Sequence, residues 1–98
     1  MNDKYILDEN NNPVICYDTI KWAKSMEDSR RVALDYINEV KISTVFLGID
    51  HDLGYGIPIL YETMIFGGEH DLYQERYSTR EEALIGHEKA IQLIKDSQ

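Results

Sequence analysis

The chain has 98 residues, of which 43% are hydrophobic and 29% charged, and eighteen acidic against ten basic residues give a net charge of −8. This size fits one domain, residues 1–98. The charge argues against duplex nucleic acid as the main partner, because phosphate binding needs a basic surface. No apolar run approaches the roughly 20 residues of a membrane span. The polar N-terminus lacks the apolar core of a signal peptide, so we expect a cytoplasmic protein without a membrane partner.

The N-terminal third predicts a β-hairpin followed by a short helix. Strands are expected at residues 4–7 and 14–16, because the segment between them is dense in Asp, Asn and Pro, which favour turns. Asp18 suits the N-cap of a helix. That helix is expected over residues 19–29, where apolar residues recur at helical spacing.

A meander of three or four antiparallel strands is expected next. Apolar and polar residues alternate over residues 30–36, and residues 41–49 and 59–66 form two longer apolar runs rich in β-branched and aromatic residues. A polar, glycine-containing loop at residues 50–58 separates these runs. Residues 73–77 are predicted to return as a short edge strand.

The C-terminal segment predicts an amphipathic helix. Ser78 and Glu81 are expected to form its capping box, in which the hydroxyl accepts from a backbone amide and the carboxylate reaches back to the cap. His87 lies on the apolar side, where we expect a structural histidine whose ring bonds back to the meander. The order ββαβββ(β)α predicts an α+β fold, with two helices packed on antiparallel sheet.

Both faces of the two middle strands are apolar. One face is expected to carry Ile42 and Phe46 with some of Leu60, Met64 and Phe66, and the other Val45, Leu47 and Ile49 with Tyr61 and Ile65. Two short helices cover only one face well. We therefore expect the second face to meet the N-terminal hairpin, a second copy of the chain or a different protein, and we favour a homodimer.

Two segments resemble a small family of phage and prophage proteins. Residues 40–68 follow the pattern VxISTVFLGIDHxxGxGxPxLxETMIFGG, and residues 75–87 follow ERYSTxEEAxxGH. Similarity at the N-terminus extends the resemblance to nearly the whole chain. It implies a protein of a mobile element that acts in the bacterial cytoplasm, as an accessory or anti-defence factor.

The loop after the long middle strand is the main candidate for function, since polar, glycine-containing hairpin tips often carry it. The candidate binding residues are Asp50, His51, Asp52 and Tyr55 in the loop and Tyr61 and Glu62 in the next strand. The leading hypothesis is a non-enzymatic accessory protein that binds a host or phage protein through these residues. Inhibition of a bacterial defence protein, in the manner of an anti-CRISPR protein, is one form of it.

Two other functions stay open. The loop amides and a stacking Tyr55 could bind a small molecule such as a nucleotide signal. Asp50, His51 and Asp52 could instead supply ligands for a metal-dependent enzyme, although no spacing typical of a metal site is present. The single cysteine, Cys16, excludes an intramolecular disulfide and a four-cysteine zinc site. We assign no catalytic residue, metal ligand or cofactor.

Overall fold

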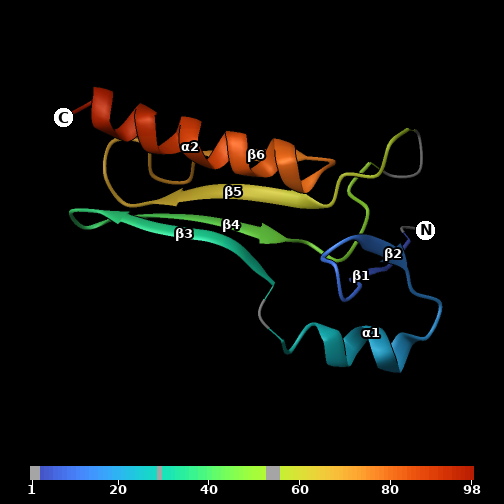
Figure 1. The fold of residues 1–98 in the computed structure, drawn as a ribbon. Helices are drawn as coiled ribbons and strands as arrows, with labels where there is room; N and C mark the ends of the chain where they lie inside the picture. Colours follow the sequence, from blue (N-terminus) through green and yellow to red (C-terminus); the bar gives the residue numbers. More distant parts are fainter. Residues whose placement is uncertain (1–2, 29, 53–55) are drawn as a thin grey trace.

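A computed structural model describes residues 3–28, 30–52 and 56–98 (Figure 1). Its elements are β1 (Tyr5–Leu7), β2 (Pro13–Ile15), α1 (Thr19–Ser25), β3 (Arg31–Ile37), β4 (Val40–Phe46), β5 (Tyr61–Phe66), β6 (Gln74–Tyr77) and α2 (Arg80–Asp96). β1 and β2 form an antiparallel hairpin, and the other strands form an antiparallel sheet in the order β3-β4-β5-β6. The predicted α+β fold and its order of elements are confirmed.

Short-range hydrogen bonds explain the N-terminal turns. The Asp8 Oδ1 atom accepts from the amides of Asn10 and Asn12, at 2.8 and 2.9 Å, and closes the turn between β1 and β2. The Asp18 carboxylate accepts from the Ile20 and Lys21 amides. Asp18 is therefore the N-cap of α1, as the sequence predicts.

Several boundaries differ from the prediction. α1 ends at Ser25, four residues before the predicted end. The connection between β4 and β5 is longer than the predicted loop, because β4 ends at Phe46 and β5 begins at Tyr61. Gly48 has a φ of +76°, a conformation that turns the chain out of the strand.

The capping box of α2 lies one residue later than predicted. Thr79, not Ser78, is the N-cap, and its hydroxyl accepts from the amide of Glu82 at 3.1 Å. The carboxylate of Glu82, not Glu81, accepts from the Thr79 amide at 3.0 Å. Ser78 contributes only its amide, which donates to the same carboxylate at 3.2 Å.

α2 covers one face of the four-stranded sheet. Three cross-strand pairs of β4 and β5 lie buried beneath it: Ile42–Ile65, Thr44–Thr63 and Phe46–Tyr61. Leu60 packs in the same cluster as Phe46, but Met64 and Phe66 alternate to the other face. The predicted grouping of Tyr61 and Ile65 with Val45 is wrong, because the register differs by one residue, which exchanges the faces of a strand.

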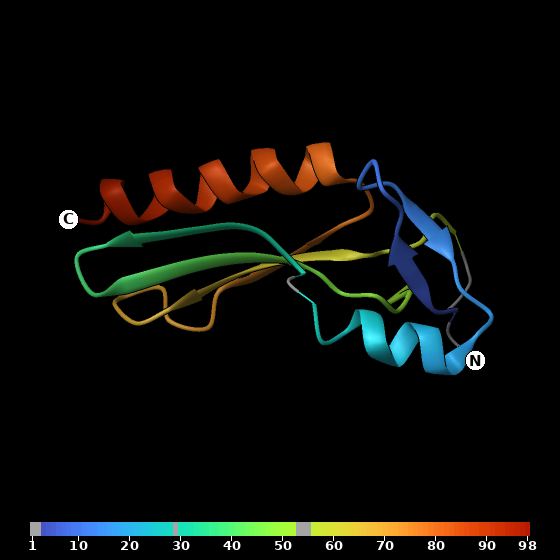
Figure 2. The same cartoon turned by 60° about the horizontal axis from the view of Figure 1, so that its bottom comes forward.

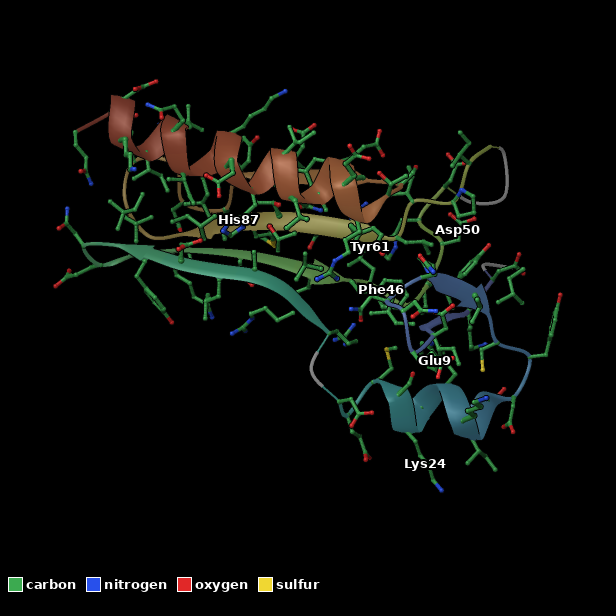
Figure 3. The ribbon with its side chains drawn as sticks, viewed as in Figure 1. Glu9, Lys24, Phe46, Asp50, Tyr61 and His87 are labelled. Carbon is green, nitrogen blue, oxygen red and sulfur yellow. The ribbon has the colours of Figure 1, made fainter. Side chains whose placement is uncertain are left out.

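The core beneath α2 consists of two apolar clusters with polar side chains between them. One cluster includes Phe46, Tyr61 and Ala83, and the other is formed by Ile42, Ile65, Ala90 and Ile94. Between them lie Thr44, Thr63 and His87, each at most 2% exposed. Figure 3 shows His87 and Tyr61 between α2 and the sheet.

The N-terminal hairpin and α1 lie beyond one end of the sheet (Figures 1 and 2). They are joined to it through the segment after β4, where the Tyr5 amide donates to the Gly48 carbonyl at 2.8 Å and the Trp22 indole donates to the same carbonyl at 2.9 Å. The molecule measures 45 × 28 × 22 Å and is therefore elongated. Neither helix of the described chain has the length and apolar character needed to cross a bilayer.

Candidate functional site

Asp50 organises the loop after β4 from its interior. Only 4% of the residue is exposed, and its Oδ1 atom accepts from the amides of Asp52 and Ile59, at 2.8 and 3.0 Å. Its own amide donates to the Asp3 carbonyl at 3.0 Å. The carboxylate of Asp50, a predicted binding residue, therefore closes the base of the loop.

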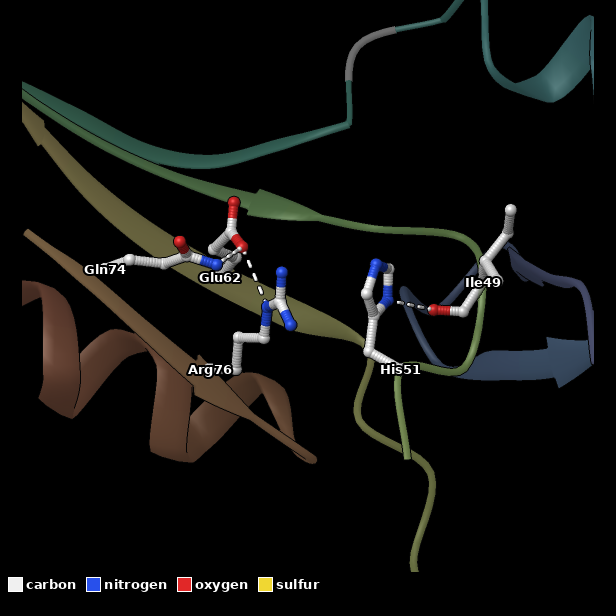
Figure 4. Close-up of polar contacts among 5 residues, drawn as sticks. All are labelled: Ile49, His51, Glu62, Gln74 and Arg76. Atoms are coloured by element: carbon white, nitrogen blue, oxygen red, sulfur yellow. Dashed lines mark hydrogen bonds and ion pairs between the residues drawn. The ribbon is translucent and has the colours of Figure 1, made fainter. Parts of the chain in front are cut away.

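The neighbouring loop residues contact their own backbone. The His51 Nδ1 atom lies 2.8 Å from the Ile49 carbonyl oxygen (Figure 4), and the His51 amide donates to the Ile59 carbonyl at 3.0 Å. Asp52 is half-buried beside Gly56. Tyr55 lies outside the described residues. His51 therefore braces the two sides of the loop.

Tyr61 and Glu62 point to opposite faces of β5. Tyr61 is 0% exposed and packs on Phe46, with ring centroids 5.5 Å apart. Its burial raises the pKa of the phenol above the ordinary value, and Arg80 opposes this rise. Tyr61, a predicted binding residue, therefore lies in the core beneath α2. Glu62 accepts from Gln74 at 2.6 Å and from Arg76 at 2.9 Å (Figure 4). Within the described residues, no hydrogen bond or ion pair joins Glu62 to Asp50, His51 or Asp52.

A hydrogen-bonded chain joins α2 to the meander through His87. The His87 Nδ1 atom lies 2.7 Å from the Thr44 hydroxyl, which is 2.5 Å from the Thr63 hydroxyl. The Nε2 atom lies 2.7 Å from the Asp35 carboxylate of β3. A carboxylate, an imidazole and a hydroxyl in this order are typical of nucleophilic catalysis. Here the Thr44 hydroxyl is 0% exposed beneath α2, so no substrate reaches it and the chain of bonds holds the helix in place.

The partners of His87 are not evident from the sequence. Asp35 and His87 are 52 positions apart, and Thr44 and Thr63 fit ordinary strand residues. The only local signal is the alternation that places a threonine in the middle of each apolar strand, on the side that α2 covers.

The face of the four-stranded sheet opposite α2 carries no helix in the described chain. α2 packs on all four strands, whereas α1 contacts only β1 among the described elements. We call the uncovered side the open face. The register places these residues on it: Arg31, Leu34 and Tyr36 from β3, Lys41, Ser43 and Val45 from β4, Glu62, Met64 and Phe66 from β5, and Gln74 and Arg76 from β6.

The open face carries apolar and basic side chains together. Leu34, Met64 and Val45 are half-buried, while Tyr36 and Phe66 are 61% and 39% exposed. Lys41 lies between the two aromatic residues in the register, and its Nζ atom is 5.4 Å from the centre of the Phe66 ring.

Charge on the open face is opposite to that of the whole chain. Arg31, Lys41 and Arg76 outnumber Glu62, whose carboxylate already accepts from Arg76. The whole chain has a net charge of −8. The open face is thus an apolar and basic surface on an acidic protein.

In the described part of the chain, no three His, Cys, Asp or Glu side chains gather where they could hold a metal ion. Comparisons with protein-family models, curated proteins and solved structures found no match for this chain. Functional inference therefore depends on the geometry of its own surfaces.

Proposed function

We propose that this protein is a non-enzymatic binding module that holds a partner protein against the open face of its β3–β6 sheet. The observation that supports the proposal is an uncovered sheet face whose apolar residues lie next to the exposed rings of Tyr36 and Phe66 at one end of the face. Contiguous exposed apolar patches mark interaction sites, and aromatic residues are enriched in interfaces. This surface replaces the loop at residues 50–58 as the leading site.

The charge on the open face favours a different protein over a second copy. Packing two copies through this face would set a net basic surface, with Arg31, Lys41 and Arg76, against an identical one, and like charges across an interface cost affinity. A partner with an apolar strip bordered by acidic residues avoids that cost. The resemblance to phage and prophage proteins makes a bacterial or phage protein the expected class, with a defence protein as one form. The homodimer expected from the sequence is the alternative occupant.

The experiment compares capture of proteins from a bacterial lysate by the immobilised chain and by two variants. The first variant, Tyr36→Ala with Phe66→Ala, removes both exposed rings from the open face. The second, Tyr17→Ala, is the matched control, because Tyr17 is 90% exposed and follows β2 at the far end of the molecule. Circular dichroism and thermal melting establish that each variant is folded, and light scattering gives the mass of the free chain.

We expect a partner that the parent chain and Tyr17→Ala capture equally and that the double variant loses. Equal capture by the double variant would place the partner elsewhere and contradict the proposal. Failure of the parent chain to capture any protein would also contradict it. A mass of twice the chain that returns to one chain in the double variant would assign the open face to a homodimer.

A further inference from the structure

We infer that the outer edge of β6, with the cleft between β6 and α2, forms a second binding site that takes an extended basic peptide segment as a fifth strand of the sheet. This site uses a strand edge and the helix side of β6, not the open face. It therefore does not depend on the function proposed above.

β6 presents unpaired backbone groups along its outer edge. In the sheet order β6 is terminal, and among the described elements it contacts only β5 and α2. The carbonyls of Tyr73 and Tyr77 accept from Ile65 and Leu60 on the β5 side, at 3.1 and 3.0 Å. Because backbone groups alternate in direction along an antiparallel strand, the N–H and C=O groups of Gln74 and Arg76 point outward. An added strand would pair with these groups, as in β-strand addition.

A cleft of about 400 Å³ lies where the side chains of an added strand would enter. Tyr73, Glu75 and Tyr77 line it from the helix side of β6, and Ile85 and Lys89 are among the residues that line it from α2. Ile85 is 52% exposed on the flank of the helix. Alternate side chains of a fifth strand point to the same side as those of β6, so they would occupy this cleft beneath the flank of α2.

The charges of the cleft favour a basic side chain. Glu75 and Glu82 line it against a single cation, Lys89. Within the described residues, no ion pair joins Lys89 to either carboxylate. The Tyr73 and Tyr77 rings add surfaces against which an ammonium or guanidinium group packs favourably. The net charge of −8 also attracts a basic segment at longer range.

A second copy of β6 is a poor occupant of the same edge. When two copies of one strand pair antiparallel in a continuous sheet, the residue at the centre of the pairing lies opposite the same residue of the other copy. This follows because directly paired side chains lie on the same face of the sheet. The two registers centred on this strand place Glu75 opposite Glu75, or Arg76 opposite Arg76, and like charges directly opposite each other are destabilising. Short charged edges are a common protection against self-association, so a strand from a different protein fits better.

The experiment measures fluorescence anisotropy with labelled eight-residue peptides at about 0.15 M salt, where long-range attraction is largely screened. The probe alternates Val and Lys. Its N-methylated form, methylated on alternate residues, has the same charge but lacks half of the backbone donors, and a Val-Glu peptide reverses the charge. Two pairs of variants test the chain itself: Gln74→Pro against Gln74→Ala, and Glu75→Lys against Glu81→Lys.

The two pairs of variants distinguish binding at the β6 edge from a general attraction between charges. Gln74→Pro removes an outward N–H at the first strand position, where proline is tolerated, while Gln74→Ala removes only the side chain. Glu75 lines the cleft and Glu81 does not, yet both changes alter the net charge equally. We expect Gln74→Pro, Glu75→Lys and N-methylation each to weaken binding of the Val-Lys peptide by about two- to tenfold, the effect of one hydrogen bond or more.

Three results would overturn the inference. Equal affinity of the N-methylated peptide would mean that charge alone attracts the probe. Equal weakening by Glu75→Lys and Glu81→Lys would exclude the cleft, and equal affinity for the Val-Glu peptide would exclude a basic ligand. None of these results bears on Tyr36 or Phe66, so the open face is tested separately.

Discussion

Gly86 lies in the middle of α2, where alanine would ordinarily stabilise a helix by about 1 kcal/mol. Here we expect Gly86→Ala to destabilise the protein. A Cβ atom at this position would overlap the phenol of Tyr77, at its Oη, Cζ and Cε1 atoms. Tyr77 pairs with Tyr61 across β5 and β6, so its backbone is held in the sheet and its ring must turn into the cleft beside β6 to relieve the overlap. Overpacking of this kind costs about 1–3 kcal/mol, which leaves a net loss of up to about 2 kcal/mol after the gain in helix propensity.

The same change should have the opposite sign once the ring is absent. Tyr77→Val keeps a β-branched residue in the strand and removes the three overlapping atoms. In that background Gly86→Ala should raise the free energy of unfolding by about 1 kcal/mol. Urea unfolding of the parent, both single variants and the double variant gives the coupling between the two sites, expected to be about 1–3 kcal/mol. A stabilising Gly86→Ala in the parent chain, or a coupling near zero, would refute the close packing of Tyr77 on α2.

Three further predictions concern α2 and the core. Thr79→Ala should lower the free energy of unfolding by about 1 kcal/mol, whereas Ser78→Ala should leave it nearly unchanged, since only the Thr79 hydroxyl caps α2. His87→Phe should cost about 1–3 kcal/mol by removing the bonds that fix α2, and an unchanged urea midpoint would contradict this role. The Tyr61 hydroxyl is buried without a partner among the described residues, so Tyr61→Phe should leave stability at pH 7 unchanged or raise it by up to about 1 kcal/mol. Because burial raises the pKa of Tyr61 above 10.0, the unfolded chain loses this proton first, and stability should fall as the pH rises from 10 through the folded pKa. Unfolding measured between pH 9 and 12 should show a smaller fall in Tyr61→Phe.

The order of elements follows from local patterns, but the choice between two adjacent caps does not. Ser78 with Glu81 and Thr79 with Glu82 both match the capping-box pattern. Only the packing of α2 on the sheet decides between them, because a shift of one residue rotates the helix by about 100° and turns its apolar stripe away.

For a similar reason, the sequence does not predict which face of the sheet is buried. Residues on both sides of β4 and β5 are apolar, so alternation did not reveal which side is buried. The register across the connection from Leu47 to Leu60 depends on pairing between distant segments. Asp50 shows the same limit at the site. A carboxylate beside a glycine-containing turn can bind a ligand or accept hydrogen bonds from the backbone equally well. Only the tertiary structure, which buries Asp50, distinguishes these two roles.

The polar layer of Thr44, Thr63 and His87 also restricts how α2 can slide along the sheet. It separates two apolar clusters, and the imidazole meets its partners, the Thr44 hydroxyl and the Asp35 carboxylate, at only one position of α2 along the sheet. Moving the helix by one turn would place the imidazole among apolar side chains and leave the threonine hydroxyls without this partner. Each buried polar group left unpaired would lower the free energy of unfolding by about 1–3 kcal/mol. A uniformly apolar interface between helix and sheet would tolerate many such shifts. The polar layer therefore selects a single alignment of α2 on the sheet, and with it which α2 residues line the cleft beside β6.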